Sequence, residues 1–177
     1  MTQVQRKQIS GNEEEISMFS AEELKGIYLL TDLNEQMLEK LLPFFQPLQF
    51  NEGDIIFEEG EKAENFYCLK RGKILLEVEI SETITISLGS IKTGYSFGWS
   101  ALLPGSFHTS YAVCTEPCEV LAIPGDKFLG LLEGDRDMGY RIMKFVSVTL
   151  KGRLERRTGQ FLKVMSKHPD IQRLLGL

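Results

Sequence analysis

Residues 74–88 read ILLEVEISETITISL and decide the fold of this chain. In the first half, apolar residues occupy every second position from Ile74 to Ile80, with Glu77 and Glu79 among the residues between them. The second half alternates in the same way from Ile84 to Leu88, with threonine and serine in between. Because successive side chains of a β-strand point to opposite faces, this period of two predicts two strands, each with one wetter face.

Shorter strand candidates lie on both sides of this pair. They are Leu48–Phe50, Ile55–Phe57, Phe66–Leu69, Thr109–Cys114 and Glu119–Ile123. Turn-forming residues separate them, for example in Arg71-Gly72-Lys73 and Pro104-Gly105. Many short strands at this spacing are typical of an antiparallel sandwich or roll, and no parallel βαβ rhythm appears. The predicted fold is therefore mainly β.

Helical patterns flank the strand region. Ser20 and Glu23 form a capping box that predicts a short helix from about Ala21. A second helix, capped by Thr31 or Asn34, carries an apolar stripe that includes Met37, Leu38 and Leu41. After the strands we expect a short helix around 128–132 and a long one over 138–165, capped by Asp135 or Asp137 and stopped by His168-Pro169. We expect three parts: an N-terminal segment 1–30, a β-roll with its lead-in helix at 31–135, and a C-terminal helical segment 136–177.

Composition excludes several classes of protein. The chain has 177 residues, of which 42% are hydrophobic, so one domain with a sizeable core is expected. A net charge of −5 argues against a wholly basic nucleic-acid-binding protein. No apolar run approaches the roughly 20 residues of a membrane span, and residues 1–20 lack the apolar stretch of a signal peptide. Three scattered cysteines argue against a disulfide framework and favour a cytoplasmic location.

Charge is unevenly distributed along the chain. Residues 138–177 contain nine basic and two acidic residues, so the remaining body is acidic. The basic segment either folds back on this body or meets an anionic partner.

Glycine-containing motifs follow one another in a fixed order. They are Phe50-x-x-Gly53-Asp54-x-Ile56-Phe57-x-x-Gly60-Glu61, Phe66-Tyr67-x-Leu69-x-x-Gly72, Gly94-x-x-Phe97-Gly98 and Leu121-Ala122-Ile123-Pro124. In this order and spacing the chain resembles, from about Leu33 to Met165, the cyclic-nucleotide-binding domain. That family includes the sensor half of catabolite activator proteins and the regulatory domains of cAMP-dependent kinases. The resemblance implies an eight-stranded antiparallel jelly roll flanked by helices.

The resemblance also implies a phosphate-binding cassette, in which a short helix after Phe-Gly offers backbone N–H groups to the cyclic phosphate. The cassette would use Phe97, Gly98, Trp99, Ser100, Ala101, Leu102, His108, Thr109 and Ser110. In the family a Glu after the Gly binds the ribose, and an Arg about ten residues later pairs with the phosphate. Here Trp99 stands in place of the Glu, and His108 in place of the Arg, or Thr109 if the loop is one residue longer.

These two substitutions weaken the expected site. Arginine supplies a permanent charge and a bidentate fork, whereas His108 is mostly neutral near pH 7. The Trp99 indole donates but cannot accept a hydrogen bond from ribose. Losing both contacts should cost roughly 1.5–3 kcal/mol each, or a factor of ~100 or more in affinity. We therefore expect weak or altered cyclic nucleotide binding, or another small anion as the ligand.

Less specific interpretations apply to the same residues. Trp99 can pack under the cassette instead of contacting a base, and His108 can be a solvated loop residue. Cys114 and Cys118 flank a turn, but two histidines and no zinc-finger spacing predict no metal site. No nucleophile elbow, P-loop or HExxH motif appears, so no catalytic residue is predicted. A cupin-like metal enzyme would need the histidine cluster that this chain lacks.

One apolar stripe runs along the long C-terminal helix. Its members are Met143, Val146, Leu150, Leu154, Phe161 and Met165. The stripe either packs on its own roll or pairs with a second copy, as the corresponding helix does in the activator family. Because it extends some 40 Å at 1.5 Å per residue, a small roll cannot easily cover it, and we expect a homodimer. About a dozen residues follow Met165, too few for a helix-turn-helix, so DNA binding is not expected.

Two functions remain as hypotheses. The first is a non-catalytic sensor or regulatory module without an output domain, with no cofactor, acting on a protein partner. The second is a degenerate β-roll that has lost its ligand and serves as a protein-interaction scaffold.

Overall fold

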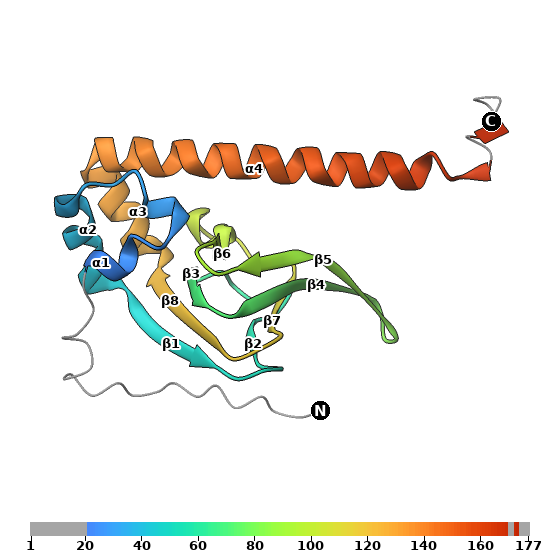
Figure 1. The fold of residues 1–177 in the computed structure, drawn as a ribbon, viewed down its shortest axis with the longest axis horizontal. Helices are drawn as coiled ribbons and strands as arrows, with labels where there is room; N and C mark the ends of the chain where they lie inside the picture. Colours follow the sequence, from blue (N-terminus) through green and yellow to red (C-terminus); the bar gives the residue numbers. More distant parts are fainter. Residues whose placement is uncertain (1–20, 170–171, 174–177) are drawn as a thin grey trace.

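The computed structural model describes residues 21–169 and 172–173, and it forms a β-roll with helices along one side (Figure 1). One sheet has the order β1(Gln46–Phe50)-β8(Cys118–Pro124)-β3(Asn65–Arg71)-β6(Ser96–Phe97). The other has the order β2(Ile55–Phe57)-β7(Tyr111–Cys114)-β4(Lys73–Ser81)-β5(Ile84–Lys92). Every pairing is antiparallel. The predicted fold class, an antiparallel jelly roll with flanking helices, is confirmed.

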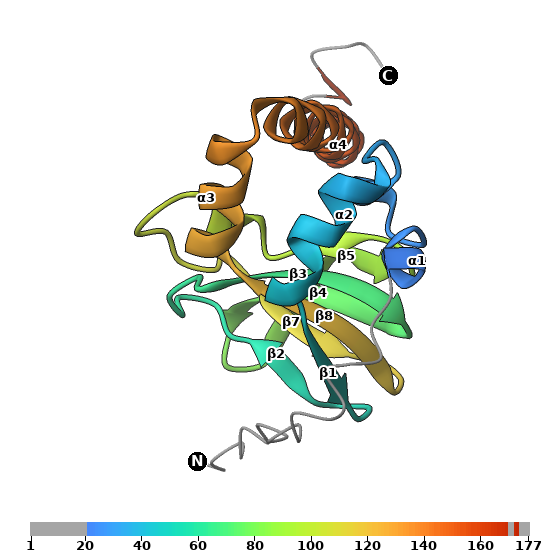
Figure 2. The same ribbon diagram turned by 90° about the vertical axis from the view of Figure 1, so that its left-hand side faces the viewer.

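Helices cover the outer face of the first sheet (Figure 2). Before the roll come α1(Ala21–Leu24), the 3-10 turn η2(Tyr28–Leu30), α2(Glu35–Leu41) and the turn η3(Leu42–Phe44). A further 3-10 turn, η4(Trp99–Leu102), follows β6, and the chain continues after β8 into α3(Gly125–Gly134) and α4(Arg136–Met165). Asn34 accepts a hydrogen bond from the Met37 amide and Asp135 accepts one from the Met138 amide, so these are the residues that cap α2 and α4. Ser20 lies outside the described residues.

Two cores lie on opposite faces of the first sheet. Phe66, Leu121 and Ile123 point into a helix-side core shared with α1, α2, α3 and α4. Their neighbours Tyr67, Val120 and Ala122 point into an interior core between the two sheets. The alternation follows from the period of two of a strand that is buried on both faces. The face to which a residue points therefore decides which part of the molecule it can affect.

The strand pair predicted from residues 74–88 forms the β4–β5 hairpin, and its apolar face is buried over only part of its length. The far end of the β4–β5 hairpin extends past the rest of the roll (Figure 1), and Ile80, Ile84 and Ile86 are exposed there. Its apolar face is covered only near its base, where Ile74 and Ile91 pair and are buried. The alternation of apolar and polar residues identified the two faces of the hairpin. It could not show how far along the hairpin the apolar face is covered by the opposite sheet.

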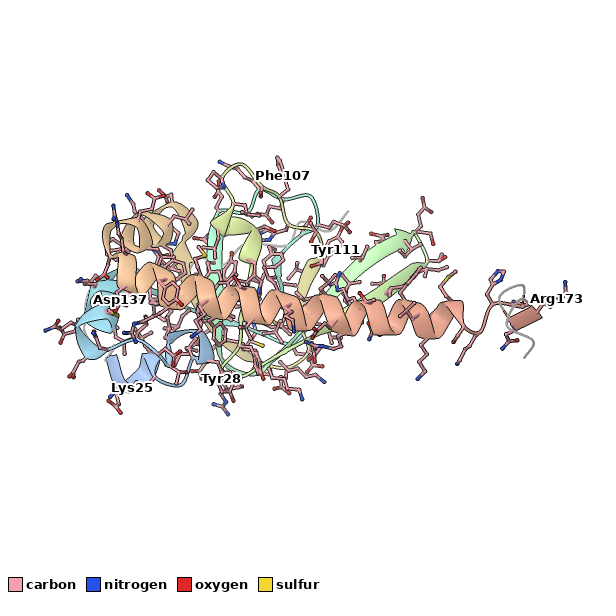
Figure 3. All side chains as sticks on the ribbon, turned by 90° about the horizontal axis from the view of Figure 1, so that it is seen from above. Lys25, Tyr28, Phe107, Tyr111, Asp137 and Arg173 are labelled. Atoms are coloured by element: carbon pink, nitrogen blue, oxygen red, sulfur yellow. The ribbon has the colours of Figure 1, made fainter. Side chains whose placement is uncertain are left out.

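The long helix α4 lies across the roll and extends past it (Figure 3). Met138, Ile142 and Val146 bury its first half in the helix-side core, and no α4 residue beyond Val146 is buried. Within the described residues, no helix is both long and apolar enough to cross a membrane.

Candidate functional site

The cassette begins at a glycine whose conformation and surroundings exclude a side chain. Gly98 has a φ of 74°, and a Cβ atom there would lie 2.8 Å from the Tyr67 ring and 3.1 Å from the Asn65 carbonyl oxygen. Phe97, before the glycine, is fully buried, and Ala101 and Leu102 anchor η4 in the helix-side core. The Phe-Gly frame is therefore a packing requirement as well as a sequence motif.

The loop that follows η4 is held to the β2–β3 connection by backbone hydrogen bonds. The Gly60 amide donates to the His108 carbonyl at 2.8 Å, and the His108 amide donates to the Glu61 carbonyl at 2.8 Å. Further along, the Ala63 amide donates to the Ser106 carbonyl at 3.0 Å. Phe107 projects at the edge of this loop (Figure 3) and is exposed. The cassette is thus fixed at both ends, with a small exposed tip.

Burial shows which of His108 and Thr109 points into the roll. His108, Ser110 and Ala112 are buried, and they alternate with exposed Thr109 and half-buried Tyr111. His108 therefore points into the roll and Thr109 points out. Of the two residues that the sequence left open, His108 is the one that lies inside the roll. Its interpretation as a solvated loop residue is wrong, because only 5% of its surface is exposed.

The His108 ring is packed inside the roll. It stacks on Phe57 with ring centres 3.6 Å apart and planes 6° apart. Burial lowers the pKa of His108 and outweighs the opposing effect of the Glu61 carboxylate. The imidazole is consequently neutral near pH 7 and cannot replace the permanent charge of an arginine.

Three further aromatic rings fill the interior beside His108. Phe57 lies 5.8 Å from Tyr67 and 6.0 Å from Phe97, and Tyr67 and Phe97 stack at 5.1 Å. The inner side of the cassette thus offers aromatic surfaces and one imidazole.

Trp99 lies on the other side of the sheet. Its ring packs edge-on to Phe66 at 5.1 Å within the helix-side core, and the Arg153 Cζ atom lies 5.7 Å from its centre. Trp99 and His108 are therefore not brought together, although sequence reasoning treated them as one pair. Of the two interpretations of Trp99, packing under the cassette is the one found. Ser100, next along η4, is half-buried.

The predicted dimer stripe on α4 is divided between two environments. Val146 is 9% exposed and packs in the helix-side core of its own chain, so its assignment to a seam between copies is wrong. Met143, Leu150, Leu154 and Phe161 are exposed, and Met165 is half-buried. Leu154 and Phe161 expose 67% and 61% of their surface. Only the outward part of the stripe is available to a partner.

A separate hollow of about 550 Å³ lies on the outer side of the cassette, toward α3. Its walls include Lys62, Asn65, Leu103, Asp126 and Leu129. None of the predicted cassette residues except Ala101 lines it. Among the described residues, no three His, Cys, Asp or Glu side chains gather as a metal ion would require.

The chain forms a β-roll with a Phe-Gly cassette, and its last helix lies across the roll. This arrangement is that of a class of regulatory domain. Residues 47–135 match the cyclic nucleotide-binding domain family, and the chain belongs to that family. The resemblance found in the sequence is thereby confirmed. Regulation, and not catalysis, is the general role of such domains.

Solved structures agree with this assignment. A protein from Geobacter metallireducens that is described as a putative cyclic nucleotide-binding protein is 27% identical with a TM-score of 0.67, and the match covers 77% of this chain and 99% of that one. The regulatory domain of Toxoplasma gondii PKA, solved with cAMP, is 19% identical with a TM-score of 0.65, covering 78% and 51% of the two chains. The second likeness concerns the fold alone.

Among curated proteins, an uncharacterized protein of Mycobacterium tuberculosis is 24% identical over 144 residues. The match covers 77% of this chain but only 28% of that protein. The chain therefore spans less than a third of the length of this relative.

Proposed function

We propose that this chain is a non-catalytic sensing module in which cyclic nucleotide binding is weak or altered. The observation that carries the proposal is the neutral, buried His108 in a cassette that keeps the Phe-Gly frame. The fold and the Phe-Gly frame retain a place for a ligand, while the permanent charge that holds a phosphate is missing there.

The expected affinity follows from the missing contacts. A charged hydrogen bond to phosphate contributes roughly 1.5–3 kcal/mol, and the imidazole can replace only part of it. With the ribose acceptor missing as well, we expect cAMP binding that is absent or weaker than about 10 μM. Calorimetric titration of the chain with cAMP and cGMP tests this expectation. Nanomolar binding of cAMP would contradict it.

A second function, a protein-interaction scaffold without a small-molecule ligand, is favoured by a specific observation. The rings of Phe57, Tyr67, Phe97 and His108 occupy the interior beside the cassette. A thermal-shift panel of cyclic mono- and dinucleotides separates the two functions, because a ligand that binds only the native state must raise the melting temperature. A flat response to the whole panel favours the scaffold.

We also propose that the chain forms a homodimer through α4. Tyr140, Met143, Leu150, Leu154 and Phe161 are exposed on the helix and recur at steps of three, four and seven residues. Such spacing produces one narrow apolar seam on a helix. Sedimentation at tens of micromolar tests the proposal, and a monomer at that concentration would contradict it.

A cytoplasmic location belongs to the same proposal. It rests on Cys68, Cys114 and Cys118, which are all buried as free thiols, as in proteins of reducing compartments.

A further inference from the structure

Three polar groups meet where α4 crosses β6 and the start of η4. The Arg153 guanidinium of α4 donates through Nη2 to the Ser96 carbonyl oxygen at 3.5 Å. The same guanidinium lies over the Trp99 ring, with Cζ 5.7 Å from the ring centre. Ser96 and Trp99 are three residues apart on either side of Gly98. The three residues therefore form one small cluster, here called the α4 junction.

The α4 junction lies on the helix side of the sheet, away from His108. Ser96 pairs with Cys68 across the β3–β6 ladder, and Cys68 belongs to the helix-side core. Directly paired residues of an antiparallel ladder share one face, so the Ser96 side chain points toward the helices. Phe97 pairs with Tyr67 and points into the roll. The α4 junction and the inner side of the cassette are thus separated by the sheet.

Two donors at the α4 junction are buried without a hydrogen-bond partner. They are the Ser96 hydroxyl, in a residue that is only 3% exposed, and the Trp99 indole Nε1–H. Native proteins satisfy the large majority of buried polar groups, so two unpartnered groups only three positions apart in the chain require an explanation. The indole can only donate, and the hydroxyl can donate or accept. What both groups can share is an acceptor.

The positive charge at the α4 junction is also without a carboxylate. Within the described part of the chain, neither Arg153 nor its neighbours Arg156 and Arg157 form an ion pair, and the nearby Glu155 pairs with Lys151 at 2.8 Å. Burial, followed by the charges of Arg156 and Arg157, lowers the pKa of Arg153. A nearby anion would relieve this unfavourable arrangement.

We infer that the α4 junction is a binding site for a small phosphate-bearing ligand, held by the Arg153 guanidinium, the Trp99 indole N–H and the Ser96 hydroxyl. Guanidinium is the group best suited to a phosphate because its fork donates two parallel hydrogen bonds. The residues of α4 beyond Arg153 are not buried, and they include Arg156 and Arg157, whose charges attract an anion. The site goes beyond the cassette function proposed above, because it uses neither His108 nor the interior of the roll.

Trp99 makes the inference directly testable, because it is the only tryptophan in the chain. The full chain is titrated with inorganic phosphate, pyrophosphate and cAMP while tryptophan fluorescence is recorded, with calorimetry in parallel. We expect a saturable fluorescence change with at least one of the three. Arg153→Gln should weaken that binding by about tenfold or more, because a charged hydrogen-bond pair is lost. Lys144→Gln removes one charge from an exposed position of the same helix and should leave the affinity unchanged.

Two further variants keep the test independent of any loss of stability in Arg153→Gln. Trp99→Phe keeps an aromatic ring and removes the N–H, and Ser96→Ala removes only the hydroxyl. Each should weaken the binding measured by calorimetry by several-fold, in proteins with unchanged circular dichroism.

Three results would overturn the inference. One is the absence of saturable binding of all three probes. Another is binding that Arg153→Gln, Trp99→Phe and Ser96→Ala all retain. The third is a fluorescence change produced only by polyanions such as duplex DNA, which would assign the arginines to a macromolecule. Binding of cAMP that His108→Phe abolishes and Arg153→Gln retains belongs to the cassette, and it would contradict the α4 junction while supporting the proposed function.

Discussion

Replacing His108 by arginine would restore the charge that the cassette lacks, and the structure sets the cost of doing so. Without a ligand the variant loses the stack on Phe57, worth about 0.5–1.5 kcal/mol, and buries a cation at a site that is 5% exposed. Burial of an unpaired charge is costly, and the nearby Glu61 carboxylate offsets only part of that cost. We expect a loss of about 2 kcal/mol, which lowers the melting temperature by roughly 4–8 °C in a chain of this size.

Cyclic nucleotide should reverse this loss. A guanidinium pair with the cyclic phosphate contributes roughly 1.5–3 kcal/mol, so cAMP affinity should rise by ~10–100-fold over the parent. Differential scanning calorimetry with and without cAMP measures both effects in one experiment. His108→Phe is the matched control, because it preserves an aromatic ring against Phe57 and adds no charge.

The reasoning is refuted if His108→Arg melts at the parent temperature without ligand, since His108 would then not be buried. It is equally refuted if His108→Arg gains no more affinity than His108→Phe in a folded protein. Adding Trp99→Glu to His108→Arg would not improve the test, because Trp99 packs against the helix-side core, where a carboxylate would be destabilising.

The remaining predictions concern assembly, the cassette turn and α4. Leu154→Glu should convert a dimer to monomers in sedimentation, whereas Val148→Glu, which places the same charge off the seam, should not. Gly98→Ala should lower the free energy of unfolding in urea by at least about 1–2 kcal/mol, because φ is positive and the added methyl meets Tyr67; an unchanged midpoint would contradict the geometry. The hydrogen bond from Lys40 and then that from the Met138 amide lower the pKa of Asp135. The ionised Asp135 carboxylate therefore stabilises the fold at pH values above the usual aspartate pKa, and this stabilisation is lost as the pH falls. Asp135→Asn should therefore be less stable than the parent at pH 7 and equal to it in acid melts, and a gap that persists in acid would refute the assignment.

Most of the fold could be predicted because it is recorded in local patterns. The alternation of Ile74 to Leu88 identified the long hairpin, and glycine turns bounded the shorter strands. Strand β6 was missed, since two residues are too few to show a period. The caps of α2 and α4 were each narrowed to two residues, and only the hydrogen bonds to Met37 and Met138 selected one.

The Phe-Gly frame of the site could be predicted from the sequence, but the directions and contacts of its side chains could not. His108 is buried because it stacks on Phe57, a residue about fifty positions earlier, and no local pattern reports such a contact. The positive φ of Gly98 redirects the chain, so the face to which Trp99 points could not be read from strand parity. Arg153 could not be singled out among the nine basic residues of 138–177, because only the tertiary structure brings it to Ser96.

The second half of α4 contains no buried residue. Val146 is the last buried residue of the helix, and 19 residues separate it from Met165, so about 28 Å of helix projects from this pivot at 1.5 Å per residue. A tilt of roughly 10° about the pivot moves the tip by about 5 Å but moves Arg153, seven residues out, by only about 2 Å. The displacement of a residue of α4 therefore grows with its distance from Val146. A shift at Arg153 that one side chain can accommodate corresponds, at the end of α4, to a shift nearly as large as the rise of one helical turn.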